Sequence, residues 1–153
     1  MSLQAMHDLM TELGPILDVD GVVEFAEESA WMVAFDESTQ VDIEYDEACK
    51  RLVLTGDVGA IEEHARTRAY EALLQYNYLW TEHGGVRAAL DAPRGIVALM
   101  IEVPIAELDM PRLCALLQNF RGVVEGWRSV LAAIGTGRAD APLEIPTMGM
   151  IRV

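Results

Sequence analysis

The stretch LDMPRLCALLQNFRGVVEGWRSVLAAI at residues 108–134 decides the fold class. Its apolar side chains recur every three or four residues, which places them on one face of a helix. That face carries Leu113, Leu116, Leu117, Phe120, Val123, Val124, Trp127, Val130, Leu131 and Ile134. Asp109 is the expected N-cap, and Pro111 is tolerated in the first turn. The stretch therefore predicts a long helix from Asp109 to Ile134 that covers a flat apolar surface.

Alternating apolar and polar residues predict the strands of that surface. In the clearest strand, Val41, Ile43 and Tyr45 alternate with acidic residues. The other expected strands are Trp31–Phe35, Leu52–Leu54, Val86–Leu90 and Gly95–Val103. Short polar links join the first three strands into an antiparallel meander that ends in a turn at Gly56 and Asp57. A further extended piece at Val22–Phe25 is left open.

Two shorter helices lie on either side of this meander. The first has its apolar residues at Leu3, Met6, Leu9, Met10 and Leu13 and should end at Gly14–Pro15. The second spans residues 64–83 and is apolar on two sides, one with Leu73, Tyr76 and Trp80, the other with Tyr70, Leu74 and Tyr78. A helix with two apolar sides needs two burial partners. We expect the sheet to be one partner and a second copy of the chain the other, with double burial inside one domain as the alternative.

The element order is thus α-β-β-β-α-β-β-α, an α+β domain with helices packed on a mostly antiparallel, twisted sheet. Residues 1–134 form the single expected domain and residues 135–153 a C-terminal tail. The longest apolar run is too short to span a bilayer, and the N-terminus lacks the features of a secretory signal. Cys49 and Cys114 are isolated, which fits a reducing cytoplasm. We therefore expect a cytoplasmic protein that binds no membrane.

Charge is distributed unevenly along the chain. Residues 1–64 hold sixteen acidic and two basic residues, whereas residues 65–153 hold nine of each. The whole net charge of −14 therefore belongs to the N-terminal part. Nucleic acid is not an expected partner, because binding phosphate needs a basic patch. The acidic part is interpreted either as a solubilising surface or as a face that attracts a basic or unfolded partner.

No catalytic, cofactor or metal site is expected. Asp18, Asp20, Gly21 and Glu27 resemble part of a calcium loop, but the first ligand position would fall on Ile16, which cannot ligate. The three histidines lie far apart without partners at ligand spacing. Nucleophile, Walker A and dinucleotide motifs are absent from the sequence. The chain is therefore predicted not to be an enzyme.

Five strings in order resemble the class I type III secretion chaperones, the family of the Tir and Yop effector chaperones. They are VDIEYDE at 41–47, RLVLTGDVG at 51–59, LLQYN at 73–77, GGVRAALD at 84–91 and LDMPRLCALLQNFRGVVEGWRSVL at 108–131. The resemblance implies an ATP-independent binding chaperone that holds the N-terminal segment of one or a few secreted effectors extended and soluble for export. The alternative is a YbjN-like regulatory or stress protein on the same fold, without a secreted client. The tail has no clear counterpart in the family.

The resemblance also implies where the partners bind. A homodimer interface would involve Leu73, Tyr76, Asn77, Leu79, Trp80, Val86, Ala88 and Leu90. Clients would lie along the first helix and the sheet, at Leu9, Leu13, Trp31, Val33, Phe35 and Ile43. The apolar tail, with Leu143, Ile145, Met148, Met150 and Ile151, is expected to dock on a groove of its own or a neighbouring subunit.

Overall fold

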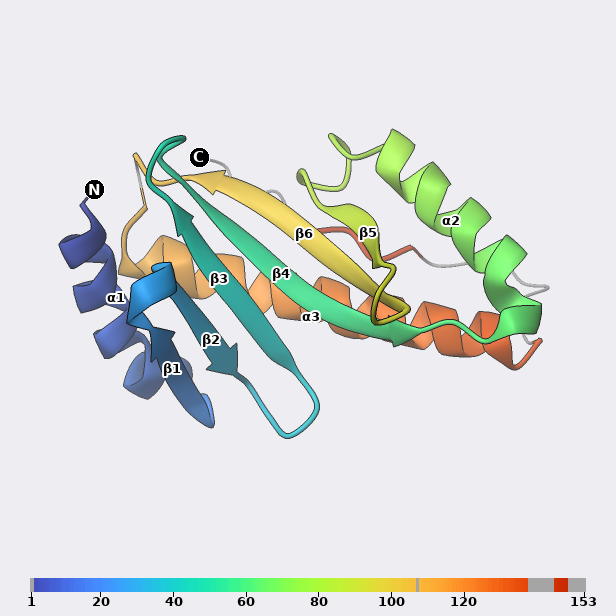
Figure 1. Cartoon of the computed structure of the whole chain (residues 1–153), viewed down its shortest axis with the longest axis horizontal. Coiled ribbons are helices and arrows are strands. Elements are labelled where there is room, and N and C mark those ends of the chain that lie inside the picture. Colours follow the sequence, from blue (N-terminus) through green and yellow to red (C-terminus); the bar gives the residue numbers. More distant parts are fainter. Residues whose placement is uncertain (1, 107, 138–144, 149–153) are drawn as a thin grey trace.

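The computed structural model describes residues 2–106, 108–137 and 145–148. The elements in chain order are α1 (Leu3–Leu17), β1 (Gly21–Phe25), β2 (Ala30–Ala34), β3 (Gln40–Asp46), β4 (Arg51–Ala60), α2 (Arg66–Tyr78), β5 (Arg87–Asp91), β6 (Ile96–Pro104) and α3 (Met110–Gly135). The strands form one antiparallel sheet in the order β1-β2-β3-β4-β6-β5 (Figure 1). The predicted α+β class is confirmed.

One face of the sheet is packed against helices. In Figure 1, α3 crosses behind the strands, α1 lies beside β1, and α2 lies next to β5 at the other end. The covered face contributes Trp31, Val33, Val41, Ile43, Leu52, Leu54, Val97 and Leu99 to the core. Asp109 caps α3 by accepting a hydrogen bond from the backbone N–H of Arg112 at 2.9 Å. The long helix is therefore the cover that its apolar face predicts.

The sheet has six strands where five were firmly expected. The extended piece left open at residues 22–25 is β1, which pairs with β2 along its whole length. Val22 packs against the core on the α1 side, whereas Val23 and Phe25 face away and are exposed. Val22 is thus the one apolar side chain of β1 that packs against the core. An alternation of buried apolar and exposed polar residues is therefore missing from this strand, which is why its sequence signal is weak.

The predicted turn at Gly56 and Asp57 is wrong, because β4 continues to Ala60. A Cβ placed on Gly56 would lie 2.7 Å from Val124 Cγ2 on α3. The glycine is required there because strand and helix approach closely, not because the chain turns. The ladder with β6 shifts register between Asp57 and Gly59, which leaves β4 continuous but bulged.

Both shorter helices end at other residues than predicted. Helix α1 continues past Pro15 and ends at Leu17. It tolerates the proline because only one hydrogen bond of the last turn is lost, while Leu17 still packs on the core. Helix α2 ends at Tyr78, five residues before the predicted end. Beyond it the chain forms tight turns, with Trp80 N–H bonded to the Asn77 carbonyl at 3.3 Å. Trp80 therefore lies on a loop and not on the helix.

The polar face of α3 also binds other parts of the chain. Arg128 donates to the Asp57 carbonyl at 2.7 Å and to the Thr39 hydroxyl at 2.8 Å. Arg121 pairs with Asp36 at 2.9 Å and with Glu125 at 2.6 Å. The bonds to Asp36, Thr39 and Asp57 fasten the β2–β3 loop and the second half of β4 to the helix. No helix within the described ranges is long and apolar enough to cross a membrane.

Candidate binding surfaces

An exposed apolar face lies on α2, the following loop and β5. Leu74 and Tyr78 are 68% and 85% exposed, and Leu90 is 50% exposed. Leu79 and Trp80 add to this surface from the loop. Large apolar side chains exposed together in this way mark a protein interaction site. We call this set of five residues the α2–β5 face.

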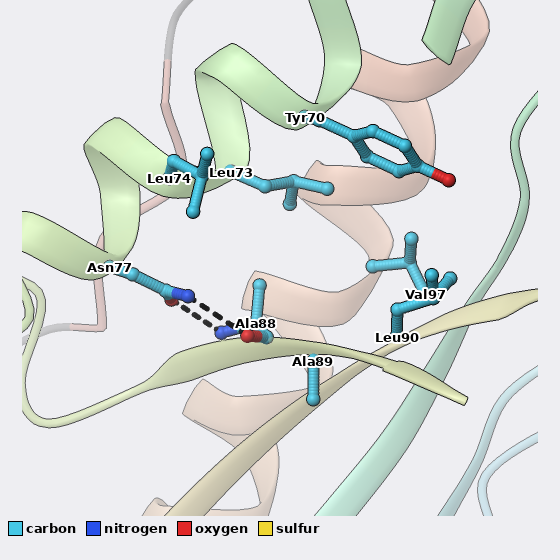
Figure 2. A pocket seen from close by; sticks show the side chains of 8 residues that line it. All are labelled: Tyr70, Leu73, Leu74, Asn77, Ala88, Ala89, Leu90 and Val97. Carbon is cyan, nitrogen blue, oxygen red and sulfur yellow. Dashed lines mark hydrogen bonds between the residues drawn. The ribbon is translucent and has the colours of Figure 1, made fainter. Parts of the chain in front are cut away.

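A shallow groove of about 270 Å³ runs through the α2–β5 face. Figure 2 shows its lining, with Tyr70, Leu73, Leu74 and Asn77 from α2 above Ala88, Ala89 and Leu90 of β5 and Val97 of β6. The Asn77 side chain accepts from the Ala88 N–H at 2.7 Å and donates to the Ala88 carbonyl at 2.9 Å. This pair of hydrogen bonds fixes the distance between helix and strand, so the groove is already formed in the single chain.

The structure divides the eight predicted dimer residues into two groups. Leu79, Trp80 and Leu90 are exposed on the α2–β5 face, and Asn77 and Ala88 are half-buried in its groove. Leu73, Tyr76 and Val86 belong to the core. Their place in a dimer interface stays a prediction, but a buried side chain offers a partner little surface.

Two prominent members of the face, Leu74 and Tyr78, are missing from the predicted interface. They lie on the second apolar side of α2, the side for which a second copy was expected. The signal was therefore present in the two-sided helix, but the residues carried over from the family lay mostly on the other side. At the start of β5, the guanidinium of Arg87 lies 4.6 Å from the ring centroid of Trp80 on the loop, a cation–π contact that favours this orientation of the indole.

A second surface lies at the opposite edge of the sheet. Strand β1 is the last strand there, and no strand of the described residues lies on its outer side. A groove of about 320 Å³ opens between α1 and β1, lined by Met10, Thr11, Gly14, Val22, Glu24 and Trp31. His7 of α1 bonds Glu24 of β1 across one end at 2.9 Å. The free edge and the groove together form what we call the β1 side.

The predicted client residues lie mostly beneath this surface. Trp31 lines the α1–β1 groove, and Leu9 is half-buried on α1. Leu13, Val33, Phe35 and Ile43 are buried in the core. These four side chains pack the sheet onto the helices and present no surface to a client in this conformation. The exposed apolar residues near β1 are instead Val23 and Phe25, at 44% and 45%.

The uncovered face of the sheet is hollowed next to β1. This hollow, of about 360 Å³, is lined by Phe25, Glu28, Ala30, Trp31, Asp42, Ile43, Glu44, Val53 and Thr55. Burial, followed by the negative charge of Asp57, raises the pKa of the Asp42 carboxyl above its ordinary value, and Arg94 offsets part of the rise. A carboxylate that is destabilised in this way favours a cationic neighbour.

The described part of the chain contains no group of three or more residues able to hold a metal ion. The strongly shifted pKa values have structural causes. Burial raises the pKa of Tyr76 to about 12, and the Trp127 side chain offsets part of the rise. The two surfaces therefore offer shape, exposed apolar area and charge, which suit binding of another polypeptide.

Comparison with known proteins agrees with this geometry. Residues 8–128 match the model of the Tir chaperone protein (CesT) family. No curated protein matches the sequence. A chain of the ExsC–ExsE complex is similar in structure, with a TM-score of 0.73, 22% identity, and coverage of 84% of this chain and 95% of that chain.

Two further solved structures are similar. A chain of the HopA1–SchA chaperone–effector complex has a TM-score of 0.69 at 20% identity and covers 84% of this chain and 97% of that chain. A chain of the heterodimeric ExoU–SpcU complex from the type III secretion system of Pseudomonas aeruginosa has a TM-score of 0.55 at 19% identity, with coverage of 84% and 98%. At these identities the likeness shows a shared fold.

Proposed function

Because the chain belongs to the Tir chaperone protein (CesT) family, we propose that it is a binding chaperone for a type III secreted effector. In this role it keeps an N-terminal segment of the effector extended and soluble in the cytoplasm until export. The observation that carries the proposal is the family match over residues 8–128. The structural relatives in chaperone–effector and heterodimeric secretion complexes support it.

The α2–β5 face is proposed to form a homodimer. Leu74, Tyr78, Trp80 and Leu90 are exposed apolar side chains in the single chain, and two copies that met here would remove them from water. Burying one such side chain contributes about 1.5–3 kcal/mol. The preformed groove held by Asn77 lowers the entropy lost on association, because helix and strand need no rearrangement.

The β1 side is proposed to receive the client. An extended segment beside β1 would add main-chain hydrogen bonds to the free edge. Successive side chains of a strand point to opposite faces, so every second client residue would face the α1–β1 groove. The remaining ones would lie near Val23 and Phe25 on the uncovered face. This arrangement favours a client segment with alternating apolar residues.

Binding and release by this mechanism need no nucleotide hydrolysis. Main-chain pairing and a few anchored side chains supply the affinity, while the client loses conformational entropy on ordering. The acidic excess of the first 64 residues keeps the apolar β1 side from associating with copies of itself. We infer that the chaperone releases its client when another binding partner competes for the extended segment.

The proposal is tested by a pull-down with the tagged full-length protein from cells of the source organism grown with secretion switched on. The bound proteins are identified by mass spectrometry, and truncations of each partner locate the retained segment. We expect one dominant partner that is exported by the cell and held through its N-terminal region. A stable homodimer that retains no exported protein would contradict the chaperone proposal and favour a regulatory protein on the same fold.

A further inference from the structure

Residues 145–148 return to the body of the molecule after α3. Met148 is only 4% exposed and is part of the hydrophobic core, and Ile145 packs against the same core. In Figure 1 this short red segment passes behind β5 on the α2 side of the sheet. The segment lies beyond residues 8–128, the part that matches the family. The family match therefore does not account for the contacts of this segment.

Two glycines receive this segment. A Cβ placed on Gly126, inside α3, would lie 2.5 Å from Pro146 Cγ and 2.8 Å from Pro146 Cβ. A Cβ placed on Gly84, in the loop between α2 and β5, would lie 3.1 Å from Met148 Cβ. Pro146 thus occupies the space of a side chain at position 126, and Met148 lies in tight contact with Gly84. The segment touches α3 at one glycine and the loop at the other.

The position of Gly126 is otherwise hard to explain. Glycine in a helix interior lowers the folding equilibrium constant about fourfold relative to alanine. Gly122 lies one turn earlier on the same helix, and a Cβ there would meet nothing within 4 Å. Gly126 differs because the ring of Pro146 lies directly on it. The contact with the segment therefore gives a reason for a glycine in the middle of the longest helix.

The loop that Met148 contacts carries side chains of both the core and the α2–β5 face. His83 is buried and stacks on Tyr76 with ring centroids 4.3 Å apart, and Tyr76 meets Trp127 of α3 edge-on at 5.1 Å. Trp80 lies in the same loop, and its carbonyl accepts the Gly85 N–H at 2.8 Å. A contact at Gly84 therefore acts on the aromatic cluster and on the exposed Trp80 together.

We propose that residues 145–148 form an intramolecular clasp, which fastens the α2–β5 loop to α3 and holds Trp80 in place on the α2–β5 face. Through the clasp, the side chain of Pro146 contacts α3 and the side chain of Met148 contacts the loop. Its effect on a dimer rests on the proposed function. The clasp itself does not, and its tests require neither a dimer nor a client.

The first test is a double-mutant cycle in the full-length chain, measured by urea unfolding at one protein concentration. Gly126→Ala should lower the folding equilibrium constant, because the new methyl group and the Pro146 ring cannot share the space. In a chain that already carries Pro146→Gly, Gly126→Ala should instead raise the constant about fourfold, as expected for a better helix former. Gly122→Ala is the control and should raise it about fourfold in both backgrounds. The proposal is overturned if Gly126→Ala raises the constant equally in both.

The second test separates local ordering from global stability. Met148→Ser should accelerate amide hydrogen exchange of residues 79–86 about tenfold more than that of β3, because the lost contact is local to the loop. Thr147→Ser, at an exposed position between the two contacts, is the matched control and should change neither. Unaltered exchange in residues 79–86 of the Met148→Ser chain would show that the segment does not hold the loop, and would overturn the clasp.

Discussion

The two edges of the sheet expose apolar side chains in parts of the chain that differ in charge: the β1 edge belongs to an acidic part and the β5 edge to a part with no net charge. At the β1 edge, Val23 and Phe25 lie in the part of the chain that holds sixteen acidic and two basic residues. At the β5 edge, Leu74, Tyr78 and Leu90 lie in the part that holds nine of each sign. Both edges are apolar enough to bind, but only one is strongly charged.

This difference teaches how one small sheet can have two partners. Two copies that met through their β1 edges would bring like charges together, which is unfavourable. Two copies that met through their β5 edges would bury apolar surface without that repulsion. Charge would therefore direct the proposed self-association to the α2–β5 face and leave the β1 side for a different polypeptide, one that tolerates or neutralises the acidic surroundings.

The largest expected effect is on the neutral edge. Leu74→Glu should raise the dimer dissociation constant at least about 100-fold, because a charge would be buried at the centre of the face. Light scattering coupled to size exclusion measures the mass, and circular dichroism checks the fold. Ile16→Glu is the control, since Ile16 is 56% exposed on α1 and should leave the dimer intact. A folded dimer of the Leu74→Glu protein would show that the interface lies elsewhere.

A change between the two edges should affect the stability of the whole chain. Gly56→Ala places a methyl group 2.7 Å from Val124 Cγ2 and should lower the free energy of unfolding by about 1–3 kcal/mol. Urea denaturation measures the loss. An unchanged midpoint would mean that α3 and β4 separate easily, and the two edges would then not share one rigid core.

On the acidic edge, Phe25→Glu should weaken client binding about tenfold and leave the dimer unchanged. The measurement is titration of the effector segment identified by the pull-down, with Glu27→Gln as a control for a charge change on the neighbouring turn. Equal affinity of the Phe25→Glu protein and the unmodified protein would exclude this side of β1 from the client site.

The smallest effect concerns Asp42, whose raised pKa means that folding disfavours its ionised form. The resulting penalty is present at neutral pH and disappears as the pH falls below the folded-state pKa. Asp42→Asn should therefore stabilise the chain slightly at pH 7, by about 0.5 kcal/mol or less at this half-exposed site. The gain should vanish in acid. A gain that grows toward low pH would contradict this explanation.

The sequence predicts helices and strands best where only one face of the element is buried. Helix α3, with its N-cap at Asp109, and strand β3 follow from periodicity alone. Glycine and proline signals are less informative, because Gly56 marks a close approach and Pro15 sits in a helix. The pattern that predicts a turn is the same as the pattern that permits tight packing.

The binding surfaces are predicted less well than the fold. Apolar residues such as Val33 and Ile43 look alike in sequence whether they pack a core or bind a client, and the structure buries them. Leu74 and Tyr78 follow from the two-sided character of α2. The apolar tail predicts that Ile145 and Met148 dock, and the structure packs both against the chain's own core. Which residues receive the segment does not follow from the sequence, because Gly84 and Gly126 are distant from it along the chain. Leu143, Met150 and Ile151 of the tail lie outside the described residues.

The bond pair between Asn77 and Ala88 also limits how many molecules can join. Both backbone groups of Ala88 are bonded to the Asn77 amide, so they point away from β6, toward the outer side of β5. A molecule with two free sheet edges could otherwise stack edge to edge into an endless fibre. Asn77 occupies the backbone positions that the next strand would need. A further strand therefore cannot pair at Ala88, and the proposed contact between two copies at the α2–β5 face would rest on side chains.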